Sequence, residues 1–473
     1  MCSSCRGEAR IADVLPARRD VLKFGGLALA GSFAGQAIWP LQASATGKAN
    51  PRRSARYCIF IEMGGAISPM DTWDFKQTRW TPPDLDMVQI NDEVSLSRVL
   101  FPNLVDRTDE VAFVRSMRAP ELIHFNGQYH TQTGRALNVA LAREIPAFGS
   151  VIAAELDGER RETDTFPTYV STYLTRARAG SIGAGFLPTR FSGLDLDPTT
   201  VFDSFGGNVD GGQQLLEERF RLLNQLAETS DAERASLGRK ASDYRAYYES
   251  AYGLLTDPRW PELFKASDSD RERYGEDEFG LGCILARNLI EADAGTRFVY
   301  IYDGDKWDHH AGIFDRSRRW NHYTTCPRLD RGFTSLLTDL AARPGIEPGR
   351  TLLDETLIVV TSEFGRTPEM NPVQGRDHYR FAYASMFAGG GVAGGRVVGK
   401  TNEDGSEVID PGWKHPGQPF MDNTVATIYS ALGIDWRKTV HNTPSGREYL
   451  YVDSISLGGS EMMFDDEIAE IFA

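Results

Sequence analysis

The chain has 473 residues, 41% of them hydrophobic and 25% charged, so it can bury the core of one large domain or of two smaller ones. Its formal net charge of -15 argues against nucleic acid or an anionic membrane surface as the main partner. Neither property selects a fold, which has to be inferred from the elements along the chain.

Residues 1–45 have the pattern of an export signal. Arg18 and Arg19 precede a weakly hydrophobic, Gly- and Ala-rich run at 24–41, and Ala43-Ser44-Ala45 offers a cleavage site between small residues. This pattern is typical of a twin-arginine signal, so we expect recognition by the twin-arginine export machinery, a periplasmic or secreted location and no stable membrane span after cleavage. The alternative is an uncleaved anchor helix, for which the run is near the short limit.

After a basic linker at 46–56, we expect one α/β domain at 57–473. Apolar runs predict strands at 57–63, 110–117, 168–173, 297–302 and 357–361, and helical spacing predicts helices at 148–156, 279–292, 326–342 and 421–432. The unbroken apolar strands indicate a sheet that is buried on both faces. Residues at about 174–275 are expected to be an insertion, first a long Gly- and Pro-rich loop that roofs the site and then helical from 213 to 255.

Polar residues follow the first strand, where ligands bind in doubly wound sheets. Ser68, Asp71 and Asp74 lie in this loop. Asp71 is a candidate metal ligand, and its alternative role is to cap the next turn.

A second polar stretch follows the strand at 110–117. It holds two of the eight histidines of the chain, His124 and His130, together with Thr131, Thr133 and Arg135. One of the two histidines can equally be a packed or exposed residue.

The densest group of candidate ligands follows the strand at 297–302. Asp303, Asp305, Asp308, His309 and His310 lie within eight residues, and Lys306 is the only nearby basic residue. Metal binding is the simplest reason for such a run of acids and imidazoles.

A third group follows the strand at 357–361. Glu363 lies at the tip of this strand, and Asp377 and His378 follow in a short loop, a combination that suits a divalent metal. The alternative is an ion pair among Glu363, Arg366 and Asp377, with His378 as a solvated loop residue.

Residues 394–401 match the letters of a phosphate-binding loop, G-x-x-x-x-G-K-T. The residues that follow are acidic and contain Gly and Pro, so they do not predict the helix that such a loop must open. We therefore interpret the glycines as backbone turns.

Together, the motifs resemble the domain of unknown function 1501 family, exported bacterial proteins placed within the alkaline phosphatase and sulfatase superfamily. The resemblance runs in pieces from about Cys58 to Gly446. In chain order, its motifs are GG-x-x-S-x-x-D-T-W-D after the first strand, CILARNLIEA before a later strand, W-D-x-H after it, and then V-T-S-E-F-G-R-T-P, G-R-D-H and A-G-G-G.

The resemblance implies an α/β fold, a doubly wound, mostly parallel sheet sandwiched by helices, with a divalent metal site at the carboxyl edge of the sheet. The metal expected there is zinc, calcium or manganese. In place of the histidine that many relatives have after the strand-tip acid, this chain has Phe364. The implied ligands are Asp71, Asp308, His310, Glu363, Asp377 and His378.

The resemblance also suggests catalytic residues. Counting back from Thr133-Gly134-Arg135 places His124 where sulfatases have a Cys or Ser, so sulfatase chemistry through formylglycine is not expected. His124 is instead a candidate nucleophile, metal ligand or general acid, and Arg135 or Arg366 is expected to bind an oxyanion. Ser68, Thr131 and Thr133 are further candidate nucleophiles.

Two functions follow from this pattern. The first is an exported, metal-dependent hydrolase of phosphate, sulfate or phosphonate esters, carried by a small molecule or a polymer. The second is a non-catalytic exported binding or scaffold protein that keeps a hydrolase-like fold with a degraded metal site.

Overall fold

The structure is a computed structural model that describes residues 43–45, 49–205, 256–453 and 464–472, together with residues 218, 221 and 222. The apolar run at 24–41 lies outside the described residues, and so does nearly all of the helical pattern at 213–255. Among the described residues, no helix combines the length and the apolar character that crossing a membrane requires.

The centre of the molecule is an eight-stranded sheet. Six of its strands run parallel to β2 by their pairings, and β12 is antiparallel to both of its neighbours. The spatial order is β13 (Val397–Val398), β5 (Val111–Met117), β12 (Tyr383–Ala388), β9 (Thr356–Thr361), β2 (Tyr57–Glu62), β8 (Phe298–Tyr302), β6 (Tyr169–Thr172) and β7 (Leu194–Leu196).

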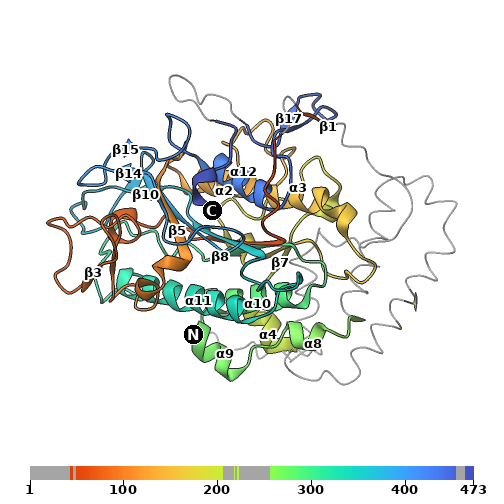
Figure 1. The fold of residues 1–473 in the computed structure, drawn as a ribbon, viewed down its shortest axis with the longest axis horizontal. Coiled ribbons are helices and arrows are strands. Elements are labelled where there is room, and N and C mark those ends of the chain that lie inside the picture. Colours follow the sequence, from red (N-terminus) through yellow and green to blue (C-terminus); the bar gives the residue numbers. More distant parts are fainter. Residues whose placement is uncertain are drawn as a thin grey trace, which may run out of the picture.

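Helices cover both faces of this sheet (Figure 1). One face carries α2 (His124–Thr133), α3 (Phe148–Glu155) and α12 (Met421–Ala431). The other carries α10 (Glu278–Ala292) and α11 (His322–Ala342), with α4 (Pro198–Phe205), α8 (Trp260–Leu263) and α9 (Asp268–Tyr274) nearby. The predicted fold class, a mostly parallel sheet between helices, is therefore confirmed.

The alternation of side chains along each strand explains the two layers. On β2, Ile59 and Ile61 face the core that contains α10 and α11, whereas Cys58 and Phe60 face the core that contains α3 and α12. All six β2 residues are buried, which is why the strand is an unbroken apolar run in the sequence.

Short strand pairs surround the main sheet. In the loop expected at 174–212, the structure places β7, whose three residues are too few to show a period in the sequence. Residues 394–401 form β13 and β14 (Lys400–Thr401), followed by β15 (Val408–Asp410) rather than by a helix, as we expect. The remaining pairs are β10 (Gly365–Arg366) with β11 (His378–Tyr379), β3 (Met87–Gln89) with β4 (Ser95–Ser97), and β16 (Lys438–Val440) with both β17 (Tyr449–Leu450) and β1 (Ala43–Ala45), the residues of the expected cleavage site.

Candidate metal centre

Three adjacent parallel strands end at one edge of the sheet and deliver the site. The last residue of β2 pairs with the last residues of β8 and β9, so the loops that follow these strands start side by side. Asp308 and His310 lie in the loop after β8, and Glu363 lies in the loop after β9. The pairing of β10 with β11 then places His378 opposite Arg366.

Helix α2 approaches this edge closely because it has a glycine at the contact. A Cβ on Gly127 would lie 2.8 Å from Cβ of Glu363, a distance that real Cβ contacts essentially never show. The close approach places His124, the first residue of α2, against Glu363.

Four side chains converge at this edge, and their ligand atoms all lie within 4.8 Å of one another. The Nε2 atoms of His124 and His310 are each 3.2 Å from Oδ1 of Asp308, and that of His378 is 3.7 Å away. His310 Nε2 and His378 Nε2 are 2.8 Å apart. Ligand atoms of a tetrahedral site with bonds of about 2 Å lie about 3.3 Å apart, so this group fits one metal ion with little movement.

Each imidazole is held through its other ring nitrogen. Nδ1 of His124 lies 2.7 Å from Glu363 Oε1, and Nδ1 of His310 lies 2.8 Å from Asp377 Oδ1. Nδ1 of His378 donates to the carbonyl oxygen of Leu122 at 2.6 Å. Metal-binding histidines characteristically have such an oxygen behind them, because it fixes the ring and leaves Nε2 for the metal.

The charges in the cluster shift the pKa values of His124 and Asp308 in opposite directions. Burial alone would lower the pKa of His124, but its hydrogen bonds to Asp308 and Glu363 and the charges of these acids raise the pKa to about 9. Burial would raise the pKa of Asp308, but hydrogen bonds from His124, His378 and Arg366 hold it well below its usual range. In the metal-free protein the anionic form of Asp308 is therefore stabilised by these imidazole donors and by the charge of Arg366.

Two arginines contact Asp308, one at each carboxylate oxygen. Arg366 is fully buried and donates to Oδ1 of Asp308 at 2.7 Å, and three further hydrogen bonds run from its guanidinium to the carbonyl oxygens of Gly65, Ala66 and Arg376. Arg178 is half-exposed and donates to Oδ2 of Asp308 at 2.9 Å. Arg366 is thus a positioning residue, whereas Arg178 faces the solvent side of the cluster.

The sequence-predicted metal residues occupy three kinds of position. Asp308, His310 and His378 lie in the cluster together with His124, for which the resemblance suggests a role as nucleophile, metal ligand or general acid. Glu363 and Asp377 lie behind imidazoles and hold their Nδ1 atoms. Oε2 of Glu363 is buried without a hydrogen-bond partner among the described residues.

Asp71 is not part of the cluster. Its two oxygens accept from Nη2 and Nε of Arg376 at 2.8 and 2.7 Å, and Ser68 donates to it at 2.6 Å. A carboxylate that is engaged in this way on both oxygens has a structural partner already, and the pKa of Asp71 stays below its usual range despite burial.

Arg135 also lies elsewhere. It forms an ion pair of 3.0 Å with Asp453, and its guanidinium carbon lies 4.2 Å from the ring centroid of Tyr449, in a separate cavity. The structure therefore does not bring Arg135 to the cluster, although the sequence suggested it as an oxyanion ligand.

The hydroxyl groups considered as nucleophiles are all engaged by other groups. Thr131 Oγ1 donates to Glu62 Oε1 at 2.6 Å, Thr133 Oγ1 donates to the carbonyl oxygen of Tyr129 at 2.8 Å, and Ser68 bonds Asp71. The site as described thus holds no hydroxyl directed at the four ligand atoms.

A second pair of histidines lies next to the cluster but is buried in the interior. His309 and His322 are 4% and 0% exposed, with ring centroids 5.1 Å apart, and Phe314 packs against His322. None of their four ring nitrogens has a hydrogen-bond partner among the described residues. Asp71 lies 3.7 Å from His322 Nε2 but is already bonded to Arg376.

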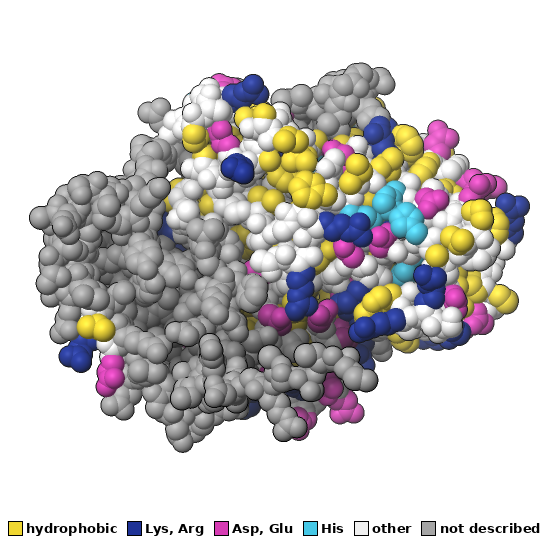
Figure 2. All heavy atoms as spheres, turned by 180° about the vertical axis from the view of Figure 1, so that it is seen from behind, with side chains coloured by type: hydrophobic (Ala, Val, Ile, Leu, Met, Phe, Trp, Pro, Cys, Tyr) yellow, Lys and Arg dark blue, Asp and Glu magenta, His cyan; other side chains and the backbone are white. Residues whose placement is uncertain are grey.

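Sequence reasoning missed two contributors to the site. Arg178 lies in the loop that we expected to roof the site, but a lone arginine there shows no pattern. The carbonyl oxygen of Leu122 is a backbone atom and has no signature in the sequence. Figure 2 shows histidine side chains at the surface of one face, with basic and acidic side chains beside them.

Several solved structures overlap with this chain. A protein in the alkaline phosphatase superfamily from Vibrio parahaemolyticus matches with 10% identity and a TM-score of 0.36, covering 89% of this chain and 75% of its own. Ps i-CgsB, solved in complex with k-i-k-neocarrahexaose, matches with 12% identity and a TM-score of 0.39, covering 81% and 72%. The lipoteichoic acid synthase LtaP from Listeria monocytogenes matches with 9% identity and a TM-score of 0.35, covering 88% and 78%. Structural matches with such low identity and TM-score assign no activity to this chain.

Among curated proteins, no sequence matches the chain. A family model, in contrast, covers most of it and agrees with the motifs around the cluster. This model, described as Protein of unknown function (DUF1501), matches residues 55–454, so the chain belongs to that family.

Proposed function

We propose that this protein is an exported, metal-dependent hydrolase of phosphate or related esters, such as sulfate or phosphonate esters. The observation that carries the proposal is the convergence of three imidazole Nε2 atoms on the Asp308 carboxylate, each imidazole being oriented by an oxygen on its Nδ1. Such preorganisation is expected of a site that binds a metal and is costly without one.

The ligand set favours a particular class of ion. Three imidazoles and one carboxylate suit zinc or another late first-row divalent metal, whereas calcium prefers six or more oxygen ligands. Held by His124, His310, His378 and Asp308, such an ion supplies Lewis-acid chemistry to an ester oxygen and to water.

The surrounding residues then have distinct tasks. Glu363 and Asp377 hold His124 and His310 in the orientation that directs Nε2 to the centre. Arg178 bonds Asp305 through Nε and Asp308 through Nη2 and is half-exposed, so it is the arginine best placed to bind a substrate oxyanion. All three guanidinium nitrogens of the buried Arg366, in contrast, already donate to protein oxygens. His124, as a ligand, is then not the nucleophile.

The attacking group in this proposal is water. The nearby hydroxyls of Thr131 and Thr133 are bonded to Glu62 and to a backbone carbonyl, and exchanging these bonds would leave buried acceptors unpaired. Export by the twin-arginine route, which carries folded and metal-loaded cargo, belongs to the same proposal and is supported by Arg18, Arg19 and the run at 24–41.

The test has two measurements on the purified mature protein. Metal analysis should find a stoichiometric divalent ion, and a panel of aryl phosphate, phosphonate and sulfate esters should include at least one that is turned over. Asp308→Ala should remove both the metal and the turnover. His441→Ala, which changes a histidine that bonds Glu448, is the control and should retain both.

A second candidate is a metal-binding protein without catalysis. It is favoured by the absence, among the described residues, of a hydroxyl directed at the cluster. It is also favoured by Phe364, fully buried, with its ring 5.1 Å from that of His124 and 4.7 Å from that of His378. Stoichiometric metal without turnover of any ester in the panel would support this candidate against the hydrolase.

A further inference from the structure

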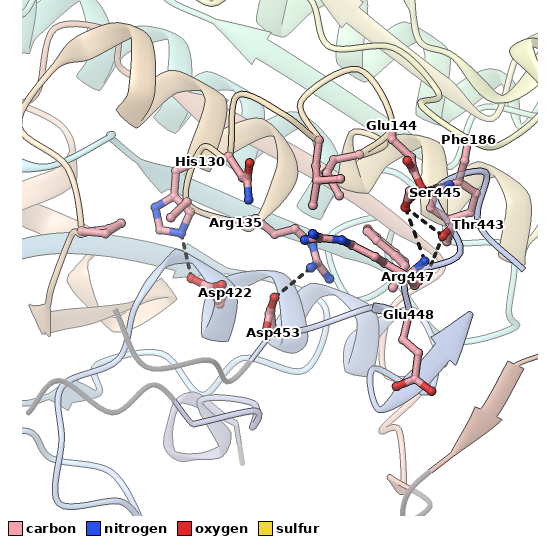
Figure 3. Close-up of a pocket in the computed structure, with 16 residues that line it drawn as sticks. His130, Arg135, Glu144, Phe186, Asp422, Thr443, Ser445, Arg447, Glu448 and Asp453 are labelled. Carbon is pink, nitrogen blue, oxygen red and sulfur yellow. Dashed lines mark hydrogen bonds and ion pairs between the residues drawn. The ribbon is translucent and has the colours of Figure 1, made fainter. Parts of the chain in front are cut away.

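A cavity of about 360 Å³ lies at the other end of α2 (Figure 3). His130, Arg135 and Glu144 line it from the α2 side, and Asp422 lines it from the first turn of α12. The loop before β17 closes the far side with Thr443 and Ser445, and Figure 3 shows Arg135 between this loop and the His130–Asp422 pair. The cavity is separate from the four metal ligands, none of which lines it.

The cavity contains buried polar atoms that lack partners. Asp422 is 1% exposed, and its Oδ2 bonds His130 Nε2 at 2.7 Å, but its Oδ1 has no hydrogen-bond partner among the described residues. Nε and Nη2 of Arg135 are also buried and have no hydrogen-bond partner in the described part of the chain, although Nη1 donates to Asp453. An unpaired acceptor and two unpaired donors in one cavity are costly, unless a ligand or water both donates and accepts there.

The charge of the lining excludes simple ions. The lining includes four carboxylates, those of Glu144, Asp422, Glu448 and Asp453, and two arginines, Arg135 and Arg447. Glu448 is largely exposed, bonds His441 and points away from Arg135 in Figure 3. The charge of Arg135 is already balanced by Asp453 at 3.0 Å. A small anion would therefore meet net repulsion and would leave Asp422 Oδ1 unpaired, while a simple cation would leave the Arg135 donors unpaired.

One wall of the cavity is apolar. Leu141, Ile145 and Phe186 line it, and Phe186 packs edge-on against Tyr449 at 5.0 Å between ring centroids. A ligand that fits must therefore offer carbon-bound hydrogens on one side and hydrogen-bonding groups on the other.

We propose that this cavity binds a neutral polyhydroxylated ring, a single sugar unit. One hydroxyl donates to Asp422 Oδ1, a neighbouring hydroxyl oxygen accepts from Arg135, and the C–H face of the ring packs on Phe186. The binding site stands apart from the metal centre, so it holds whether or not that centre hydrolyses esters.

The experiment measures binding of D-glucose, D-galactose and D-mannose to the full mature protein by saturation-transfer NMR and calorimetry, with acetate and inorganic phosphate as anionic probes. At least one sugar should bind saturably. Asp422→Asn and Arg135→Lys should each weaken that binding at least about tenfold, since the first replaces a charged acceptor by a neutral one and the second removes the Nε and Nη2 donors of the guanidinium.

The matched control is Asp466→Asn, which alters another carboxylate paired with a histidine, His415, and should leave sugar affinity unchanged. If Asp422→Asn or Arg135→Lys fails to fold, Phe186→Ala, at the half-buried wall, takes its place with the same expected loss. Saturable binding of none of the three sugars would overturn the proposal. So would sugar affinity that survives the cavity variants, or Arg135-dependent binding of an anion in place of the sugars.

Discussion

His309 and His310 are neighbours in the chain, and they lie in opposite surroundings. His310 lies at the surface, with Nδ1 on Asp377 and Nε2 facing Asp308. His309 points into the interior beside His322, where neither ring has a hydrogen-bond partner among the described residues. The difference shows that several histidines in one loop do not by themselves make a metal site. Carboxylates and carbonyl oxygens that bond Nδ1 decide which imidazoles direct Nε2 toward a metal.

The acids beside the two histidine groups differ in the same way. Asp308 keeps three imidazole nitrogens within 3.7 Å, although two arginines also contact it. Asp71, near His322, is held on both oxygens by the buried guanidinium of Arg376. A carboxylate in such a pair cannot serve a cation without leaving the arginine charge uncompensated.

The largest expected effect tests this assignment of Asp71. Asp71→Ala should lower the free energy of unfolding by about 3–5 kcal/mol, because Arg376, 1% exposed, would keep a buried charge without a partner. Urea denaturation measures the change. Asp84→Ala, which removes an exposed partner of Arg316, is the control and should cost at most about 1 kcal/mol. Unchanged stability together with loss of bound metal would instead make Asp71 a ligand.

The next effect tests the oxygens behind the imidazoles. Glu363→Gln should weaken zinc binding by about 10–100-fold, because the amide holds the Nδ1–H of His124 less firmly than the carboxylate does. Asp377→Asn should weaken it less, since Asp377 is largely exposed. Competition with a chromophoric chelator gives both affinities, and equal affinities for wild type and Glu363→Gln would contradict the orienting role.

The third prediction uses the opposite pKa shifts of two buried histidines in the metal-free protein. The pKa of His124 is raised to about 9, so its contribution to stability is complete below about pH 6.5 and is lost as the pH rises toward 9. Burial, His322 and Arg366 hold the pKa of His309 well below its usual value, so stability falls as the pH drops below about 6.5, where only the unfolded chain takes up that proton.

On both the acidic and the alkaline side, the free energy of unfolding should change by at most about 1.4 kcal/mol per pH unit for one histidine. Chemical denaturation of chelator-treated protein between about pH 5.5 and pH 9 measures both changes. His124→Gln should reduce the loss of stability at alkaline pH, and His309→Leu should reduce the loss of stability at acidic pH. An alkaline slope that persists in His124→Gln would assign it to another group.

Much of the fold was predictable from the sequence, because buried parallel strands are continuous apolar runs. The six residues of β2 and of β9 are all buried, and the polar residues that end such runs reach the sheet edge as expected. Asp308, His310, Glu363 and His378 were therefore identifiable as members of one site.

The partners of the remaining residues were not predictable, because they depend on contacts between distant parts of the chain. Asp71 meets Arg376 across 305 positions, and Arg135 meets Asp453 across 318. The orientation of Arg135 toward a cavity instead of the cluster follows from how α2 packs, and no local pattern encodes it. The same holds for the inward and outward directions of His309 and His310.

The smallest expected effect concerns the pair in the interior. His309→Leu removes two ring nitrogens that have no hydrogen-bond partner among the described residues and places carbon atoms beside Trp307 and His322. The free energy of unfolding at neutral pH should therefore change by less than about 1 kcal/mol. Zinc affinity should equal that of the wild type, because His309 contributes no ligand atom to the cluster. The matched variant is His310→Leu at the next position, which should lose zinc affinity and keep its stability. If His309→Leu instead lost the metal, the interior pair would have to be counted as part of the centre, and the contrast between the two neighbours would disappear.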